Sequence, residues 1–459
     1  MKRRACKYLQ FSQMWSLGCG LVGMVVVVVL AGCSNSLGLP EEVPLSAGMA
    51  SPRYVQTLEL VGGESIETVE ERTGGDVLVW KPGEYALIGL DSIGDRDEPT
   101  QIETIVEENS DSFLAGGKLA EMNGKSMIWS GGKSMIWSGG KSMIWSGGKS
   151  MIWSGGEFVW MPENTATWQQ VRLEEAQGMA ANLGYGVTVA VVDTGVDLYH
   201  PGLSEALAPQ SDWWDFFDDD ALPHEDGSYG DRGYGHGTNV AGIVRQIAPR
   251  ATILPLRVLG PNGQGDVADL SSAIDWAVSR GADIINLSLG ADHRIQAVDK
   301  ALRNAAQSGV FVFTSTGNTG DRDVTYPATS TFNGVEADAM VNVTSVGASD
   351  EKSDFATYHR QIELAAPGED IFGPAPEERM AAWSGTSMAA PMGSGALALA
   401  LGEVLAVERE SLPGLLKASS ADVYAGGLNG QYKNEVGDGR IDVAAFIERV
   451  AFSGGSETE

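Results

Sequence analysis

The chain has 459 residues, of which 43% are hydrophobic and 20% charged, and this balance excludes a disordered protein. Its length allows two to three domains, one of them large enough to bury a full core. The formal net charge of −30 excludes nucleic acid as an expected partner, because phosphates would be repelled. The three cysteines, Cys6, Cys19 and Cys33, all lie near the N-terminus, so no disulfide can staple the folded part.

Residues 1–32 have the layout of an export signal. Four basic residues and no acid precede an apolar run from about Leu17 to Leu30, which ends in Leu30-Ala31-Gly32-Cys33. The run is shorter than the roughly 20 residues that a membrane-spanning helix needs, and the order of basic, apolar and small residues is typical of a signal peptide. The ending resembles a bacterial lipoprotein box, which implies cleavage before Cys33, its lipidation and a membrane-anchored protein of the cell envelope. An ordinary signal peptide and an uncleaved anchor are the alternatives.

Residues 33–52 are rich in Pro, Gly and Ser and are interpreted as a tether. Residues 53–115 predict a small α/β domain. Its strand candidates are Tyr54–Leu60, Val77–Trp80 and Tyr85–Leu90, and Ser65–Arg72 is a short helix.

A linker at 116–164 follows. It contains four perfect copies of Lys-Ser-Met-Ile-Trp-Ser-Gly-Gly at 125–156. A period of eight is too short for the common helical or propeller repeats, so we interpret this segment as a spacer. A strand stack or an adhesive segment is the alternative, because exposed apolar strands invite pairing.

From Val187 onward, buried strands alternate with helices. Between the strands, residues 266–280 place apolar side chains on one helical face and stop at Gly281. Strands that are apolar on both faces and alternate with helices predict an α/β domain with a parallel sheet flanked by helices, at 165–452, with a tail at 453–459. In such sheets functional residues gather at the carboxyl ends of the strands. The strand candidates are Val187–Val192, Ile253–Val258, Ile284–Leu289, Val310–Phe313 and Met340–Val346.

Three short segments contain residue types suited to nucleophilic hydrolysis. Asp193-Thr-Gly directly follows a strand, Gly-His236-Gly-Thr holds one of only five histidines, and Gly-Thr-Ser387-Met-Ala-Ala-Pro opens a helix of small residues. A serine at a helix start gains positive dipole potential and a nearby N–H donor for an oxyanion. Taken singly, each residue has another interpretation. Asp193 could cap a strand end or form half of an aspartic-protease pair. His236 could be a structural residue or a metal ligand, and Ser387 could cap a helix.

Together these segments resemble the signature blocks of the subtilase family, in the order Asp, His, Ser. The resemblance covers roughly residues 165–450. It implies a subtilisin-like fold and a serine endopeptidase that acts on proteins or peptides through an acyl-enzyme on Ser387. His236 would be the general base, and Asp193 would orient it. The block Ser315-Thr-Gly-Asn318 resembles the one whose Asn side chain binds the oxyanion.

The resemblance extends to substrate binding and to the N-terminal domain. Leu287-Ser288-Leu289-Gly290 resembles the family's edge segment that pairs with the substrate backbone, and Gly263-Gln-Gly265 resembles the opposing wall. An ordinary strand and turn are the alternatives. Residues 53–115 resemble a subtilase propeptide by position and pattern, which would act as folding chaperone and inhibitor. A small structural domain is the alternative.

The chain also departs from the family pattern, and metal binding stays open. Asn239 stands where a second histidine is frequent, and Met392 and Gly393 replace the residues usual after Ala-Ala-Pro. The chemistry needs no cofactor. The acidic run Asp215–Asp220 could hold structural calcium, although it lacks EF-hand-like spacing and an exposed acidic loop is preferred.

An active endopeptidase is the leading hypothesis. The alternative is a catalytically inactive surface protein that binds partners through the Trp-rich repeats. If the protease is active, self-cleavage between about residues 115 and 168 would cut the covalent tether and release a soluble extracellular form, unless the propeptide stays bound.

Overall fold

The helices and strands that the structure describes all lie between Tyr54 and Phe452. The export signal, Cys33, the tether, the repeats at 125–156 and the tail fall outside the described residues. Among the residues that are described, no helix is long and apolar enough to cross a membrane. The computed structural model describes residues 54–60, 64–90, 106–108, 114–115, 162–229, 231–291, 294–330, 332, 334–377, 379–403 and 407–452.

The N-terminal domain is a four-stranded antiparallel sheet with one helix. The strands run in the order β2-β3-β1-β4. Ser65 caps the helix by accepting the Thr68 N–H, and Gly74 ends it in the left-handed conformation. The first three strands and the helix lie within one residue of the predicted bounds. The elements are β1 (Tyr54–Glu59), α1 (Ile66–Thr73), β2 (Asp76–Lys81), β3 (Tyr85–Leu90) and β4 (Val106–Glu108).

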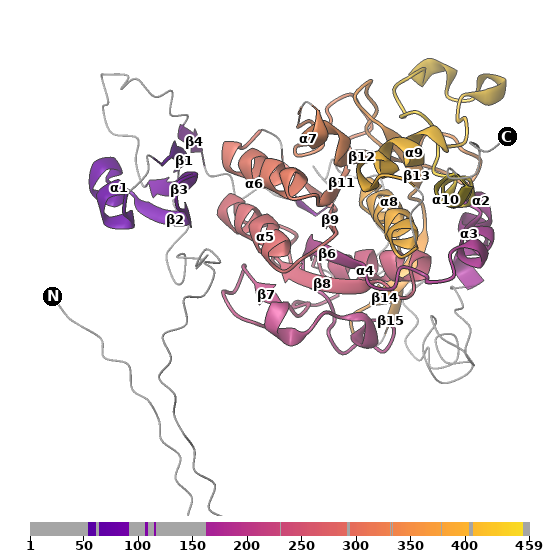
Figure 1. The fold of residues 1–459 in the computed structure, drawn as a ribbon. Helices are drawn as coiled ribbons and strands as arrows, with labels where there is room; N and C mark the ends of the chain where they lie inside the picture. The colour runs from indigo at the N-terminus through magenta and orange to yellow at the C-terminus, as the bar shows by residue number, and fades with distance from the viewer. Residues whose placement is uncertain are drawn as a thin grey trace, which may run out of the picture. The chain divides into compact units, whose positions relative to one another are not determined.

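The larger domain is built on a seven-stranded sheet in which every neighbouring pair is parallel. The strand order is β13-β12-β11-β9-β6-β8-β7 (Figure 1). The predicted parallel α/β sheet is confirmed. The strands are β6 (Thr188–Asp193), β7 (Trp214–Asp215), β8 (Thr252–Arg257), β9 (Ile284–Leu287), β11 (Phe311–Ser315), β12 (Met340–Val346) and β13 (Leu364–Pro367).

One predicted strand is divided in the structure. The apolar run Ile284–Leu289 forms β9 and a separate two-residue strand, β10 (Leu289–Gly290), with Ser288 between them. Apolar character alone could not show this break, because Ser288 leaves the sheet to exchange hydrogen bonds with Ser387.

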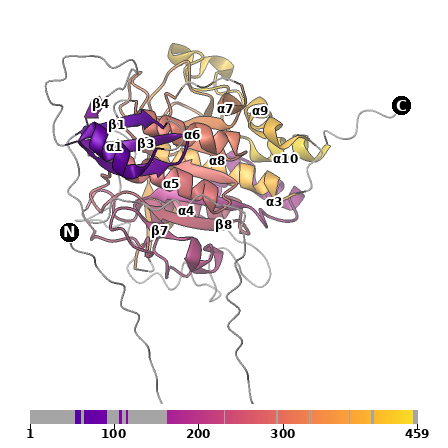
Figure 2. The ribbon, with the colours of Figure 1, turned by 60° about the vertical axis from the view of Figure 1, so that its left-hand side comes forward.

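Helices cover both faces of the large sheet. Helices α5 and α6 pack together on one face, and α4 and α8 pack on the other (Figures 1 and 2). Side chains of β6 alternate between the two: Val189 and Val191 join the α4/α8 core, and Ala190 and Val192 join the α5/α6 core. The hairpin β14 (Ile371–Ala375) and β15 (Arg379–Trp383) precedes α8. The helices are α2 (Thr165–Gln170), α3 (Leu173–Met179), α4 (His236–Ile247), α5 (Val267–Ser279), α6 (Gln296–Gln307), α7 (Val335–Asp338), α8 (Thr386–Leu401), α9 (Leu412–Ala418) and α10 (Val443–Phe452).

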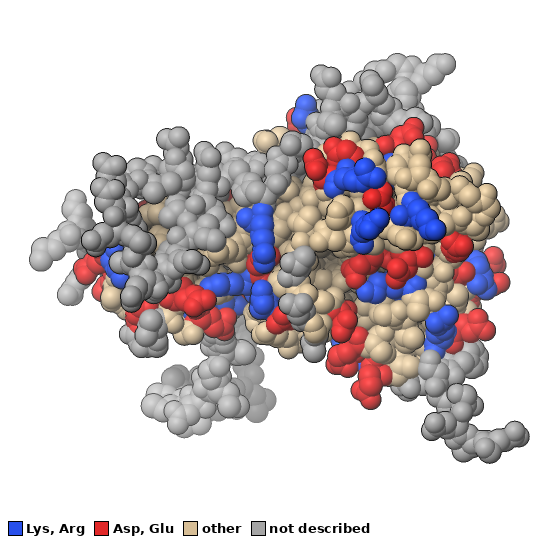
Figure 3. All heavy atoms as spheres, turned by 90° about the horizontal axis from the view of Figure 1, so that it is seen from above, with Lys and Arg blue, Asp and Glu red and all other residues tan. Residues whose placement is uncertain are grey.

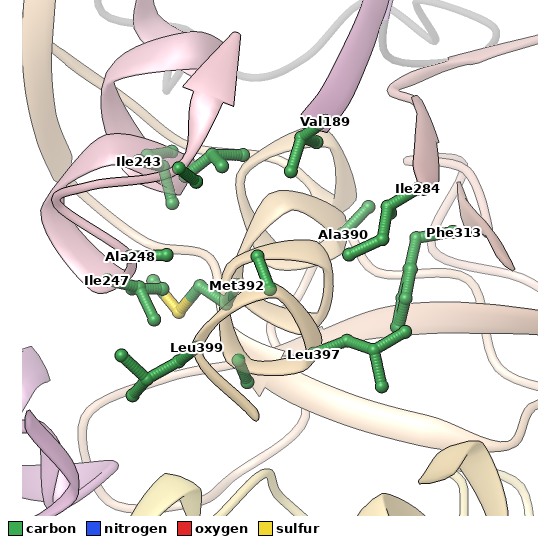
Figure 4. Close-up of a cluster of buried hydrophobic side chains, with 14 of the residues drawn as sticks. Val189, Ile243, Ile247, Ala248, Ile284, Phe313, Ala390, Met392, Leu397 and Leu399 are labelled. Atoms are coloured by element: carbon green, nitrogen blue, oxygen red, sulfur yellow. The ribbon is translucent and has the colours of Figure 1, made fainter. Parts of the chain in front are cut away.

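Helix α8 lies in the centre of one core, and small residues let it fit there (Figure 4). Residues 386–400 of this helix are all buried. A Cβ added to Gly393 would lie 2.6 Å from the Phe313 ring, and one added to Gly395 would lie 2.9 Å from Ile247. The glycines therefore bring α8 close to both β11 and α4, and this close packing fixes the start of the helix.

The charged surface is mixed in sign. Among the described side chains on the face in Figure 3, Asp and Glu alternate with Lys and Arg. Ion pairs of the described residues include Arg322 with Glu435 and Arg409 with Asp283, both at 2.9 Å.

We expect Gly393→Ala to lower the free energy of unfolding by about 1–3 kcal/mol, because the added methyl group overpacks the core against Phe313. Urea denaturation of the full-length chains measures this. Gly178→Ala in α3 is the matched control: its Cβ would meet nothing within 4 Å, and it should stabilise by about 0.5–1 kcal/mol. Equal shifts in the two variants would contradict the packing account.

Candidate active site

Asp193 and His236 form a buried hydrogen-bonded pair. Asp193 ends β6 and is fully buried, and its Oδ1 lies 2.7 Å from His236 Nδ1. Because an ionised carboxylate only accepts hydrogen bonds, the proton belongs to Nδ1. The same oxygen accepts the Thr194 N–H at 2.8 Å. The hydrogen bond to Asp193 therefore occupies Nδ1 and leaves Nε2 as the imidazole nitrogen that Asp193 does not bind.

Glycines allow the backbones on either side of this pair to approach closely. His236 is the first residue of α4, and Gly235 before it has a φ of +92°. A Cβ added to Gly237 would lie 2.2 Å from the Gly195 carbonyl oxygen, which no side chain tolerates. The Gly-His-Gly segment therefore brings the start of α4 against the end of β6.

Ser387 begins the neighbouring helix. It is the second residue of α8, which packs along α4, and it is 1% exposed. Its hydroxyl donates to the Ser288 carbonyl at 3.2 Å, and the Ser288 hydroxyl donates to the Ser387 carbonyl at 2.8 Å. Among the described residues, His236 Nε2 has no hydrogen-bond partner. The structure thus joins Asp193 to His236, whereas the Ser387 hydroxyl is bonded to Ser288 and not to the imidazole.

Asn318 is fixed beside the start of α8. Its Oδ1 accepts the N–H of Thr386 at 2.8 Å and the Thr386 hydroxyl at 3.1 Å. A Cβ built on Gly385 would lie 3.3 Å from Asn318 Nδ2 and 3.7 Å from Ser387 N. The two nitrogens therefore flank Gly385. An N–H in the first turn of a helix lacks an intrahelical acceptor and is suited to bind an anionic oxygen.

The charges around His236 favour its protonated form. Burial would lower the pKa of His236, but the Asp193 carboxylate and its hydrogen bond, together with Glu225, raise the pKa above its usual value. An imidazole in this setting accepts a proton more readily and holds it more strongly.

Sequence reasoning did not find two residues of this site. Glu225 is 3% exposed and lies close enough to act on the charge of His236. It stands in an acidic stretch that looks like a surface loop, so no sequence signal distinguishes it. Trp383 packs edge-on against the His236 ring, with 5.3 Å between centroids. Its position shortly before the Ser387 segment was the only available signal.

The predicted substrate-binding residues fall into two places. Ser288 contacts Ser387 directly, and Leu289 and Gly290 form β10, which pairs antiparallel with the two-residue strand β5 (Leu114–Ala115). The turn that contains Gly263 and Gly265 lies instead beside the segment leading into α4, where Gly233 donates to the Pro261 carbonyl at 2.8 Å.

A polar cavity lies next to β10 and Asn318. It has a volume of about 360 Å³, and Ala291 and Thr319 line it together with the charged residues Asp321, Arg322 and Asp323. Ala291 directly follows β10 and Thr319 directly follows Asn318, so the cavity lies near the end of β10.

The N-terminal domain is joined to α5 through buried polar contacts. Lys81 Nζ lies 2.6 Å from Asp275 Oδ1, and both side chains are at least nine-tenths buried. Tyr85 donates its hydroxyl to Asp275 at 3.1 Å. Burial raises the pKa of Asp275, and Lys81 opposes that rise. Apolar residues around this pair, including Leu78 and Leu87, share a core with α5 and α6.

The acidic run Asp215–Asp220 does not fit a calcium site. Arg257 Nη1 binds Asp215 at 2.7 Å and Asp218 at 2.5 Å, so a cation already pairs with these carboxylates. In the part of the chain that is described, no group of three or more His, Cys, Asp or Glu is placed to hold a metal ion.

Residues 184–439 match the model of the subtilase family. The chain belongs to this family. Over 257 residues this subtilase is 36% identical to the major intracellular serine protease of Bacillus subtilis (strain 168), covering 53% of this chain and 75% of that protein. It is 34% identical to thermitase of Thermoactinomyces vulgaris, covering 50% and 80%. A solved protease structure from Pseudoalteromonas arctica PAMC 21717 has a TM-score of 0.53 at 26% identity, covering 63% of this chain and 98% of that one. The family and the fold predicted from sequence are confirmed, and the chain is a serine-type hydrolase.

Proposed function

We propose that this subtilase is an endopeptidase in which Asp193, His236 and Ser387 form the catalytic triad and Asn318 helps to bind the oxyanion. The observation that carries the proposal is the buried 2.7 Å hydrogen bond between Asp193 and His236, with Ser387 at the start of the adjacent helix. Protein and peptide chains are the substrates.

The residues divide the reaction between them. Ser387 Oγ attacks the scissile carbonyl carbon while His236 Nε2 takes the hydroxyl proton, and Asp193 stabilises the imidazolium that forms. The imidazolium then gives this proton to the leaving amine as the C–N bond breaks, which leaves an acyl group on Ser387. Water, deprotonated by His236, hydrolyses the acyl ester and restores the serine.

The proposed reaction requires the Ser387 hydroxyl to leave its observed hydrogen bond. The Ser387 hydroxyl is bonded to the Ser288 carbonyl, and rotation about χ1 moves Oγ between staggered positions. We propose that one such position faces His236 Nε2. Hydrogen bonds of a catalytic site are often long or misaligned before substrate binds, so the observed arrangement is compatible with activity.

The oxyanion would be held by two N–H groups of different origin. Thr386 fixes the oxygen of the Asn318 amide, which supports a role for Nδ2 as one donor. The backbone N–H of Ser387 is the second, and it gains from the positive end of α8.

Substrate would bind through its backbone along β10. The pairing of β10 with β5 supports this, because an extended segment already completes that edge. The polar cavity lined by Ala291 and Thr319 would receive a substrate side chain.

The same pairing supports an inhibitory role for residues 53–115. An extended strand of the N-terminal domain on β10 would exclude a substrate strand from the same edge. The buried pair of Lys81 and Asp275 would hold this domain on α5. We propose that it acts as a propeptide, followed by a linker at 116–164.

The N-terminal sequence supports export and lipid anchoring. Leu30-Ala31-Gly32-Cys33 follows a basic and then an apolar segment. We propose that Cys33 is lipidated, and that self-cleavage between about residues 115 and 168 releases the catalytic domain as a soluble form.

Replacement of the triad serine and of the oxyanion amide should give graded losses. Ser387→Ala should lower kcat by about 10⁶, and Asn318→Ala by about 10²–10³ with little change in KM. Casein hydrolysis and a chromogenic peptide assay measure both. Ser387→Ala cannot mature by self-cleavage, so a separate protease, which is then removed, processes it before the assay. An inactive wild type that a covalent serine-hydrolase probe does not label would instead favour the surface-binding alternative.

Lys81→Ala should weaken the hold of the N-terminal domain, because Asp275 would be left buried without its cation, at a cost of about 3–5 kcal/mol. We expect a shorter lag before activity appears in purified full-length protein. Glu59→Ala is the matched control: Glu59 pairs with Lys300 at 3.6 Å and is 78% exposed, so its loss should cost about 0–1 kcal/mol. Equal lags in the two variants would argue against a propeptide role for this contact.

Cys33→Ala should abolish incorporation of labelled palmitate and shift the unprocessed Ser387→Ala chain from the membrane to the soluble fraction. For wild type, N-terminal sequencing of the soluble form should give a start between residues 115 and 168. A fully lipidated, full-length active form would rule out release by self-cleavage.

A further inference from the structure

A second carboxylate is buried beside the catalytic pair. Glu225 is 3% exposed, and its Oε2 accepts both the N–H of Thr238, at 3.1 Å, and the Thr238 hydroxyl, at 2.8 Å. Among the described residues, Oε1 has no hydrogen-bond partner. Removing a carboxylate from water costs stability, so packing alone does not account for its burial.

The contacts of Glu225 join the two elements that carry the pair. Thr238 lies in the first turn of α4, two residues after His236. Its hydroxyl donates to Glu225 and accepts the N–H of Asp197 at 2.9 Å. The Glu225 N–H itself donates to the Val196 carbonyl at 3.1 Å. Val196 and Asp197 both belong to the segment that directly follows Asp193. Glu225 therefore links this segment to the start of α4, directly through Val196 and through the Thr238 hydroxyl to Asp197.

We propose that Glu225 is a positioning residue for hydrolysis: its carboxylate clamps the first turn of α4 to the segment after Asp193 and so keeps the imidazole of His236 on Asp193. This inference rests on the proposed function, because it takes Asp193 and His236 as the catalytic pair. Glu225 acts through Thr238 and through its charge, without touching the substrate.

The electrostatics agree with this role. Burial raises the pKa of Glu225 to about 7. Hydrogen bonding to Thr194, to the Gly235 backbone and to Thr238 opposes the rise, and the charge of Asp193 adds to it. The titratable groups that bear on it are Asp193 at the end of β6, His236 at the start of α4 and Tyr234 just before that helix. When ionised, Glu225 raises the pKa of His236 and stabilises the imidazolium alongside Asp193. Removing this charge therefore lowers the pKa of His236.

Glu225→Gln, introduced into the full-length chain and assayed after maturation, tests the inference, since it keeps the size of the side chain and removes its charge. We expect kcat to fall about tenfold to a hundredfold, as when a catalytic group is misplaced by about 1 Å. KM should stay within about twofold, because the β10 edge is untouched. The acidic midpoint of the kcat/KM profile should move to lower pH.

Glu363→Gln is the matched control. Burial also raises the pKa of Glu363, whose carboxylate binds Lys417. This variant should keep the wild-type kcat and the wild-type acidic midpoint.

The outcomes separate this inference from the proposed function. An inactive wild type, or an active Ser387→Ala variant, would defeat the proposed function. If those two behave as expected, a folded Glu225→Gln variant that keeps the wild-type kcat and the wild-type acidic midpoint would overturn only the role of Glu225.

If Glu225→Gln does not fold, the Thr238→Val variant tests the inference instead, because it removes the hydroxyl link and keeps the carboxylate. A loss of kcat with unchanged KM supports the clamp, and an unchanged kcat overturns it.

Discussion

The hydrogen bond between Asp193 and His236 is the interaction on which the rest of the site depends. It is buried, and it measures 2.7 Å between the two heavy atoms. A bond of this kind requires that a strand end and a helix start meet at backbone distance. Gly237 and Gly195 permit that approach, since a Cβ on Gly237 would collide with the Gly195 carbonyl at 2.2 Å. The position of the imidazole depends on this constraint.

A second constraint comes from α8. This helix is buried along residues 386–400, and its glycines bring it against β11 and α4. Ser387 and the nearby Asn318 amide therefore take positions set by the core and not by a surface loop. A site built on packed elements keeps its geometry, which suits chemistry that relies on fixed N–H donors. Hydrophobic packing and catalytic placement are thus two consequences of one arrangement.

The N-terminal domain and the large domain meet through a different kind of contact. Lys81 and Asp275 form an ion pair that is buried on both sides. Removing one partner of such a pair lowers stability, because it leaves the other charge buried without compensation. The intact pair specifies the position of the N-terminal domain more than it adds stability. The antiparallel pairing of β5 with β10 lies at the edge proposed for substrate. The edge of β10 would therefore bind either the N-terminal domain, which inhibits the enzyme, or the substrate.

The sequence alone determined the family, the parallel α/β sheet, the strand before Asp193 and the helix that the Ser387 segment opens. These follow from local patterns: apolar runs, helix periodicity and short motifs rich in glycine. Only the tertiary structure decided the break at Ser288, the serine hydroxyl bonded away from His236, and the burial of Glu225 and Asp275. These features depend on which distant segments meet. The residue type of an acidic side chain does not reveal whether it is buried or exposed. Burial and long-range hydrogen bonding are properties of the packed chain, so no local pattern could supply them.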